Sequence, residues 1–378
     1  MSRILPLSPN LYYMRPIAIT LLIISIVLGG VVIFFAAGQK KFFIKAGNDC
    51  IYDTGDHQEL IKCFNQKVHE IGQTQGIDAA LKYANEKVIG SQPYGVVHLL
   101  MHIIGRDAYH YTKNIQKGLA YLPKDTFEEK NFINYDGYRH GLFQAFFYEN
   151  RDKEDPLILI RKACPTLGSS ASEDKVVSYR QEGDENCFHG VGHALMYANG
   201  NDVLASVAQC ARLPNANTKH WCYIGLFMEN VYLYSSGFLL YESHTPRPFV
   251  TDDAMVSLCR SFRDREQASI CSKDVGWAFW RGHYGDVRGA LAHCRLVKSE
   301  YISQCIRQLM ILPIAGFLGD DYEKITEACK GVGPLYEGVC IRAASYGIIH
   351  GTAGTAARRD KFCNMVASEF SSACFTTY

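Results

Sequence analysis

The chain has 378 residues, 39 basic and 38 acidic side chains, a net charge of +1 and 48% hydrophobic residues. This composition supports a packed core, and its length suits two or three ordinary domains or one elongated repeat array. Nucleic acid is excluded from the expected partners, because its recognition needs clustered Lys and Arg, and the sequence has no long run of one charge.

An uncharged apolar segment at residues 17–37 follows a short N-terminal tail, residues 1–16. Its sequence, IAITLLIISIVLGGVVIFFAA, spans roughly 30 Å as a helix, the hydrocarbon thickness of a bilayer. A signal peptide has a shorter apolar region of about 7–15 residues. We therefore predict a single-pass membrane anchor with the lipid bilayer as a partner, followed by a juxtamembrane linker at 38–47. The weak cleavage sequence FFAAG leaves a cleaved leader as the alternative.

Residues 48–163 are predicted to form the first helical repeats, which contain few cysteines. Two apolar helices without cysteine are expected there, VVHLLMHIIGRDAYHY at 96–111 and YRHGLFQAFFYEN at 138–150. The period-2 alternation typical of strands is almost absent from the chain. The sequence therefore predicts an all-α fold.

The second predicted part, residues 164–378, repeats a two-helix unit marked by pairs of cysteines. The chain has 14 cysteines, which in order form the pairs 50/63, 164/187, 210/222, 259/271, 294/305, 329/340 and 363/374. An even count with recurring spacing predicts a disulfide framework, whereas the CxxC spacing of zinc sites does not occur. Most second cysteines recur every 34 or 35 residues, with an insertion at 232–249, and this period is typical of helical-hairpin arrays.

Together these patterns predict a disulfide-stapled solenoid of about eight helical hairpins, preceded by one N-terminal transmembrane helix. Each disulfide is expected to tie the end of one hairpin to the start of the next. Disulfides persist outside the reducing cytosol. The C-terminal ectodomain is therefore expected in the periplasm or the extracellular space.

Histidines recur in the apolar, glycine-rich helices. His98 and His102 in HLLMH, and His189 and His193 in HGVGHALMY, are each spaced i, i+4, which places both members of a pair on one helical face. Such pairs can share a metal ion, as on HExxH helices, although no HExxH occurs here. A third ligand is expected from a neighbouring helix. The candidates are His140 and the carboxylates Glu149 and Glu229, in FFYEN and LFMEN.

These side chains suit zinc or iron as the cofactor, in one site or in two. Two other interpretations stay open. The histidines can be structural, each bonded to a backbone carbonyl. They can also line a small-molecule pocket together with tyrosines, Trp221, Trp277 and Trp280. The glycines beside them, such as Gly190 and Gly192, indicate close approach of another backbone or of a ligand.

The segments HLLMHIIGRDAY, HGVGHALMYANGNDVLASVAQC and CYIGLFMEN, within about residues 95–230, resemble motifs of a group of uncharacterised bacterial proteins. These are membrane-anchored or secreted and consist of Cys- and His-rich helical repeats. In general architecture the chain is also similar to Sel1-like and tetratricopeptide arrays, whose own sequence positions it does not reproduce. The resemblance implies an extracytoplasmic helical solenoid and transfers no catalytic residue.

Two classes of function follow from the sequence. The first is a membrane-anchored binding or scaffold module that presents a concave face to a protein or peptide partner, as solenoids commonly do. The alternative is a metal-dependent enzyme or metal-binding protein that uses the histidine cluster. The sequence does not decide whether the protein is an enzyme.

Overall fold

The computed structural model describes residues 57–87, 94–122, 129–165, 177–235, 252–283, 285–311, 318–350, 356–366 and 368–376. The predicted tail, membrane helix and linker, residues 1–47, lie outside this part of the chain, as does Cys50. Within it, no helix combines the length and the apolar character needed to cross a membrane. The chain divides into two units, Met1–Cys63 and Phe64–Tyr378, and the following description concerns the second.

The described residues form helices, short 3-10 turns and no strands, so the all-α prediction is confirmed. The first helices are α2 (His57–Gln75), α3 (Ile77–Lys87), α4 (Tyr94–Thr112), α5 (Ile115–Leu119), α6 (Glu129–Asn150), α7 (Pro156–Ala163), α8 (Val177–Ala198), α9 (Val203–Cys210) and α10 (Ala216–Ser235). They are followed by α11 (Asp252–Ser261), α12 (Arg265–Gly282), α13 (Val287–His293), η1 (Cys294–Leu296), η2 (Ser299–Tyr301), α14 (Ile302–Leu309), α16 (Tyr322–Gly331), α17 (Pro334–His350), α18 (Ala356–Met365) and α19 (Ser368–Phe375).

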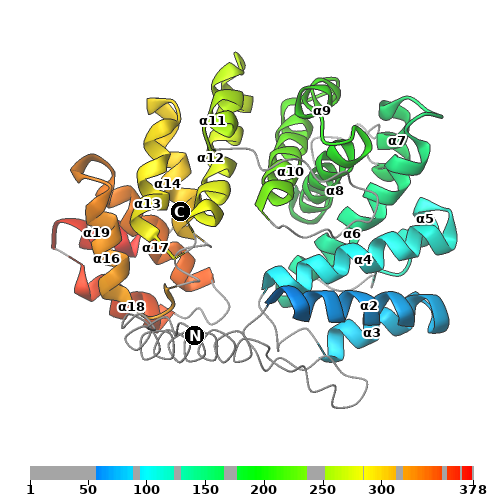
Figure 1. The fold of residues 1–378 in the computed structure, drawn as a ribbon, viewed down its shortest axis with the longest axis horizontal. Coiled ribbons are helices and arrows are strands. Elements are labelled where there is room, and N and C mark those ends of the chain that lie inside the picture. Colours follow the sequence, from blue (N-terminus) through cyan, green and yellow to red (C-terminus); the bar gives the residue numbers. More distant parts are fainter. Residues whose placement is uncertain are drawn as a thin grey trace, which may run out of the picture. The chain divides into compact units, whose positions relative to one another are not determined.

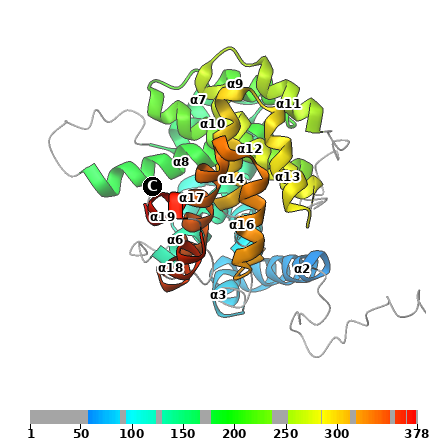
Figure 2. The same cartoon turned by 90° about the vertical axis from the view of Figure 1, so that its left-hand side faces the viewer.

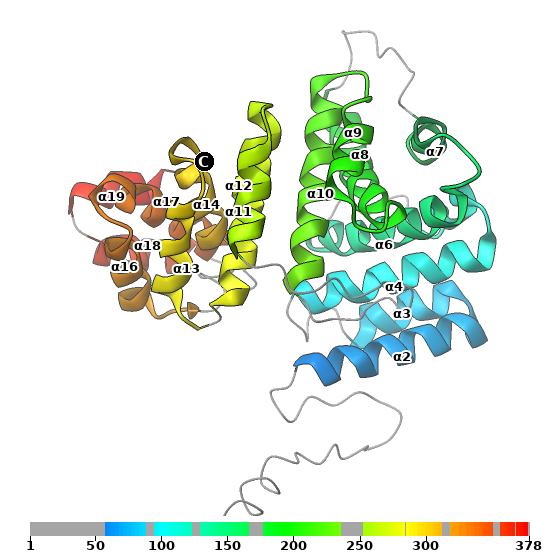
Figure 3. The ribbon, with the colours of Figure 1, turned by 45° about the horizontal axis from the view of Figure 1, so that its top comes forward.

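From α4 onward, the α-helices fall into two series, which we call inner and outer. Each inner helix packs on the next one in the order α4, α6, α8, α10, α12, α14, α17 and α19. The outer helices, α5, α7, α9, α11, α13, α16 and α18, lie between them in the sequence and are mostly shorter. Figure 3 shows one hairpin plainly, with α9 beside α8 and α10, and Figure 2 shows α12, α14, α16 and α17 together. The predicted alternation of two helix types is therefore present.

Six disulfides connect the two series. They join Cys164–Cys187, Cys210–Cys222, Cys259–Cys271, Cys294–Cys305, Cys329–Cys340 and Cys363–Cys374. In each bond the first cysteine lies in the last turn of an outer helix or directly after it, and the second lies in the next inner helix. A staple over so short a loop contributes about 3 kcal/mol in the chain-entropy model. All the predicted pairs that lie wholly within the described residues are confirmed.

Aspartates cap the N-termini of several of the outer helices. Asp202, Asp286 and Asp321 each accept a hydrogen bond from a backbone N–H in the first turn of the helix that follows. Each such cap satisfies a donor that the helix itself leaves unpaired and contributes about 1 kcal/mol. Each cap fixes the residue at which its outer helix starts. It therefore also sets the number of helical residues between the aspartate and the cysteine.

Glycines bring neighbouring inner helices into backbone contact. On α6, a Cβ added at Gly137 would overlap the carbonyl oxygen of His98, and one added at Gly141 would overlap that of His102. Both contacts advance in the same direction along the two helices, so α4 and α6 run parallel. Likewise Gly225 on α10 abuts the carbonyl oxygen of His189 on α8. The helices α4 and α6, and α8 and α10, therefore form two closely packed pairs (Figure 1).

Candidate metal centre

The two glycine-packed helix pairs bring the five predicted histidines together. The α4/α6 pair supplies His98, His102 and His140, and α8 supplies His189 and His193. Four of the rings are buried, with residue exposures of 7% for His98, 5% for His102, and 1% each for His140 and His193. His189 is partly exposed. The cluster therefore lies in the interior and reaches solvent on the side of His189.

The first group of three rings is nearly threefold in its arrangement. The ring centroids of His98, His102 and His140 are 4.9, 5.2 and 5.1 Å apart, and the ring planes are inclined to each other by 63°, 70° and 69°. One potential ligand nitrogen from each ring lies within 4.8 Å of the other two. Three imidazoles inclined in this way can bind one metal ion when the ion lies in all three ring planes.

The second group, His140, His189 and His193, meets the same nitrogen distance but differs in ring orientation. The rings of His189 and His193 are inclined by only 12°, and His140 stacks on His193 at 25° with centroids 4.2 Å apart. The close stacking of His140 on His193 keeps the in-plane lone pairs of these two rings from meeting at one point. In this structure the first group is therefore closer to a metal-binding geometry than the second.

A chain of hydrogen bonds orients one histidine of each pair. Gln144 donates its amide hydrogen to Glu229 Oε1 over 3.2 Å, so its carbonyl oxygen faces His102 Nδ1 at 3.3 Å. Glu229 Oε2 lies 2.6 Å from His193 Nδ1. Both acceptors need an N–H, so His102 and His193 carry their proton on Nδ1. Their Nε2 atoms are left with a lone pair, which is the state a metal ligand requires.

The two Nε2 lone pairs point at the partner histidines. His102 Nε2 is 3.2 Å from His98 Nε2, and His193 Nε2 is 3.0 Å from His189 Nε2. In the absence of an ion, His98 and His189 donate an Nε2–H to these lone pairs. Two nitrogens bound tetrahedrally to zinc at 2.0–2.1 Å lie about 3.3 Å apart. Each pair is thus spaced so that a metal ion could lie between the two Nε2 atoms, with the proton of the partner ring moved to its Nδ1.

His140, which belongs to both groups, is buried without hydrogen bonds. Neither its Nδ1 nor its Nε2 has a hydrogen-bond partner, although both atoms are inaccessible to solvent. An unpaired buried polar atom costs about 1–3 kcal/mol. A structural histidine is normally retained with its bonds satisfied, so this ring favours a missing ligand over a purely structural role.

Burial favours the neutral form of four histidines of the cluster. Removal from water lowers the pKa of His102 and His140 well below its usual range, and the neighbouring histidines lower it further. The same causes lower the pKa of His189, and burial lowers that of His193 to about 3. Metal binding needs the neutral imidazole. Near neutral pH, an incoming ion therefore has no ring proton to displace from a charged histidine.

The two predicted carboxylates have different positions. Glu229 is 4% exposed and contacts the cluster through His193 Nδ1, on the side of that ring away from His189. Glu229 is thus placed to orient the His193 ring. Glu149 pairs instead with His110 Nδ1 at 2.8 Å and Lys113 Nζ at 2.7 Å near the surface. Glu149 follows Gly141 by eight residues, whereas Glu229 follows Gly225 by four. The similar motifs are therefore not equivalent positions, and we leave Glu149 out of the ligand set.

Two polar residues of α6 were missed from the sequence. Gln144 links the two halves of the cluster, and Asp136 Oδ1 is buried without a hydrogen-bond partner. Burial raises the pKa of Asp136 to about 7. Asp136, His140 and Gln144 are spaced i, i+4, i+8, so they share one face of the helix. This polar column on an apolar helix is the signal that identifies them.

Trp221 lies against the exposed edge of the cluster, with its ring 6.4 Å from that of His189 and inclined by 23°. Trp280, another predicted pocket residue, is buried in the core at 6% exposure.

The chain was compared with protein-family models, with curated proteins and with solved structures, and none of the three comparisons found a match. The assignment of a function therefore depends on the geometry of the site.

Proposed function

We propose that this protein binds a transition-metal ion in the histidine cluster, with zinc or iron as the expected metals. The observation that carries the proposal is His140, whose two buried nitrogens lack partners in the middle of two three-histidine groups. Imidazole ligands suit zinc, iron, copper and nickel. Three imidazoles leave an open coordination position, so water or a small ligand can also bind the ion.

The test is the metal content of the full-length chain, purified in detergent without chelators and measured by elemental analysis. We expect a stoichiometric transition metal in the wild type and at least a tenfold lower content when His98→Ala and His102→Ala on α4 are combined with His193→Ala, which leaves no more than two histidines in either group. His110→Ala is a matched control, because His110 lies on the same helix, is exposed and pairs with Glu149. A wild-type chain that neither carries nor takes up zinc, iron or copper would refute the proposal.

A second proposal concerns the rest of the array. The inner helices from α12 to α19 pack in series and are held by four of the disulfides, with no part in the five-histidine cluster. We propose that these hairpins complete a membrane-anchored solenoid outside the cytosol and present a binding surface to a protein or peptide partner. Leu335, on α17, is 78% exposed and offers a place for a photo-crosslinker. Absence of any specific adduct in cells would count against this role.

A further inference from the structure

The hydrogen-bonding capacity of His140 points to more than one ion. A single metal ion on this ring satisfies one nitrogen and leaves the other buried without a partner. Two ions, one on each nitrogen, leave neither atom unpaired.

The surroundings of His140 supply ligands for both ions. Its ring centroid lies 5.1–5.2 Å from those of His98 and His102, and 4.2–5.0 Å from those of His189 and His193. The two pairs are built alike. In each, the second histidine is oriented through Nδ1 by a side chain of the next inner helix, Gln144 for His102 and Glu229 for His193.

We propose that the cluster holds two metal ions joined by His140 as a bridging imidazolate, one ion with His98 and His102 and the other with His189 and His193. This inference rests on the proposed metal-binding function. The second ion displaces the last ring proton of His140, so one H⁺ leaves the site for solvent as that metal–nitrogen bond forms. The negative charges of the imidazolate and of Glu229 offset part of the charge of the two cations.

The two sites are unequal, which sets an order of binding. The rings of His98, His102 and His140 already have mutual inclinations of 63–70°, whereas those of the second group lie within 12–34° of each other. Rings of the second group must turn about χ2, a soft torsion in histidine. We therefore expect the first ion at His98, His102 and His140, and the second, weaker one at His189 and His193.

The experiment titrates the metal-free full-length chain with Cu²⁺ and reads both stoichiometry and electron paramagnetic resonance. We expect two ions per chain in the wild type and in the control His110→Ala, and one ion in His189→Ala. Spins joined through one imidazolate couple to each other. The integrated signal of the two-copper protein should therefore fall well below that of two independent ions, while His189→Ala shows a full one-copper signal.

Each other outcome has a definite meaning. One ion in the wild type, or two ions with the full signal of independent spins, overturns the bridge while the proposed metal binding stands. No copper uptake by the wild type overturns both proposals. His140→Ala, checked for folding by circular dichroism, is expected to weaken both sites. Unchanged affinity at both would also refute the bridge.

Discussion

At the scale of single residues, the identity of the atom facing each Nδ1 decides what the cluster can bind. Glu229 accepts only, so His193 must present Nδ1–H to it and a lone pair at Nε2. Gln144 transmits the same requirement to His102, since its amide hydrogens face the carboxylate. One carboxylate thus fixes the tautomers of histidines on two different helices.

Replacing Glu229 with Gln is therefore expected to weaken metal binding. The new amide can turn an N–H toward His193 Nδ1, which moves the ring proton to Nε2, the ligand position. Loss of such an orienting partner typically costs about 10- to 100-fold in metal affinity. Competition with a chelator measures the change. Glu149→Gln is the control, because Glu149 pairs with Lys113 and His110; an equal loss in both variants would contradict the role given to Glu229.

Asp274 gives a pH dependence away from the cluster. It is 3% exposed on α12, its Oδ2 has no hydrogen-bond partner, and burial raises its pKa to about 6. The folded chain therefore holds a proton on Asp274 that the unfolded chain releases above its ordinary pKa of 3.8. Its contribution to stability is lost as the pH rises from about 4 to about 6.

We accordingly expect Asp274→Asn to stabilise the metal-free chain near pH 7 by up to about 3 kcal/mol, and to have little effect near pH 4. Urea unfolding at the two pH values measures the difference. Asp152→Asn, at a side chain that is 84% exposed, should change stability at neither pH. A destabilised variant at pH 7 would show instead that the Asp274 carboxylate makes a favourable interaction.

At the scale of helices, the sequence predicted the hairpins and the histidine pairs, but it did not predict how the helices are rotated against each other. Cysteine spacing fixed the hairpins, because a disulfide over 11 or 12 residues leaves few other ways to connect two helices. The i, i+4 spacing also predicted that both histidines of each pair lie on one face of their helix. Gln144 and the separate position of Glu149 depended on how α6 is turned against its neighbours. That rotation is set by tertiary packing at glycines such as Gly141, which no local pattern encodes.

Gly141→Ala tests this packing. The added methyl group would overlap the carbonyl oxygen of His102, so α4 and α6 must separate. Overpacking against backbone cannot be relieved by a rotamer change, and we expect a loss of about 3 kcal/mol or more together with weaker metal binding. Gly338→Ala on α17 is the control, since its added Cβ lies at an ordinary 3.5 Å from Phe370. Thermal unfolding and metal titration compare the two; equal behaviour would contradict the close approach.

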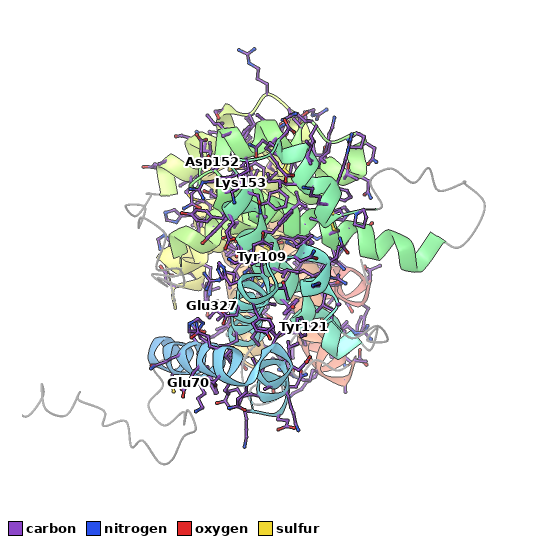
Figure 4. The ribbon with its side chains drawn as sticks, turned by 90° about the vertical axis from the view of Figure 1, so that its right-hand side faces the viewer. Glu70, Tyr109, Tyr121, Asp152, Lys153 and Glu327 are labelled. Carbon is purple, nitrogen blue, oxygen red and sulfur yellow. A yellow bond between two sulfur atoms is a disulfide. The ribbon has the colours of Figure 1, made fainter. Side chains whose placement is uncertain are left out.

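At the scale of the molecule, the disulfides and the histidine cluster lie in different parts of the array. Every described inner helix from α8 to α19 carries a disulfide cysteine, whereas α4 and α6 carry none. Packing and polar contacts hold those two helices, such as the hydrogen bond from Asn150 on α6 to the Tyr109 hydroxyl on α4. Tyr109 is labelled in Figure 4. The histidine cluster joins α4 and α6 to α8. A bound ion would therefore act there as the disulfides act elsewhere.

Metal removal should consequently loosen one part of the chain selectively. At a free metal concentration 100 times the Kd, binding stabilises the folded state by about 2.7 kcal/mol, or about 100-fold in an opening equilibrium. Hydrogen exchange of the full-length protein should accelerate by up to about that factor in α4 and α6 after chelation, with little change in α17, which a disulfide secures. His98→Ala should make α4 insensitive to the chelator. Uniform acceleration along the whole array would instead indicate that the helices open as one cooperative unit. No acceleration in α4 would show that a metal ion in the histidine cluster does not stabilise this helix.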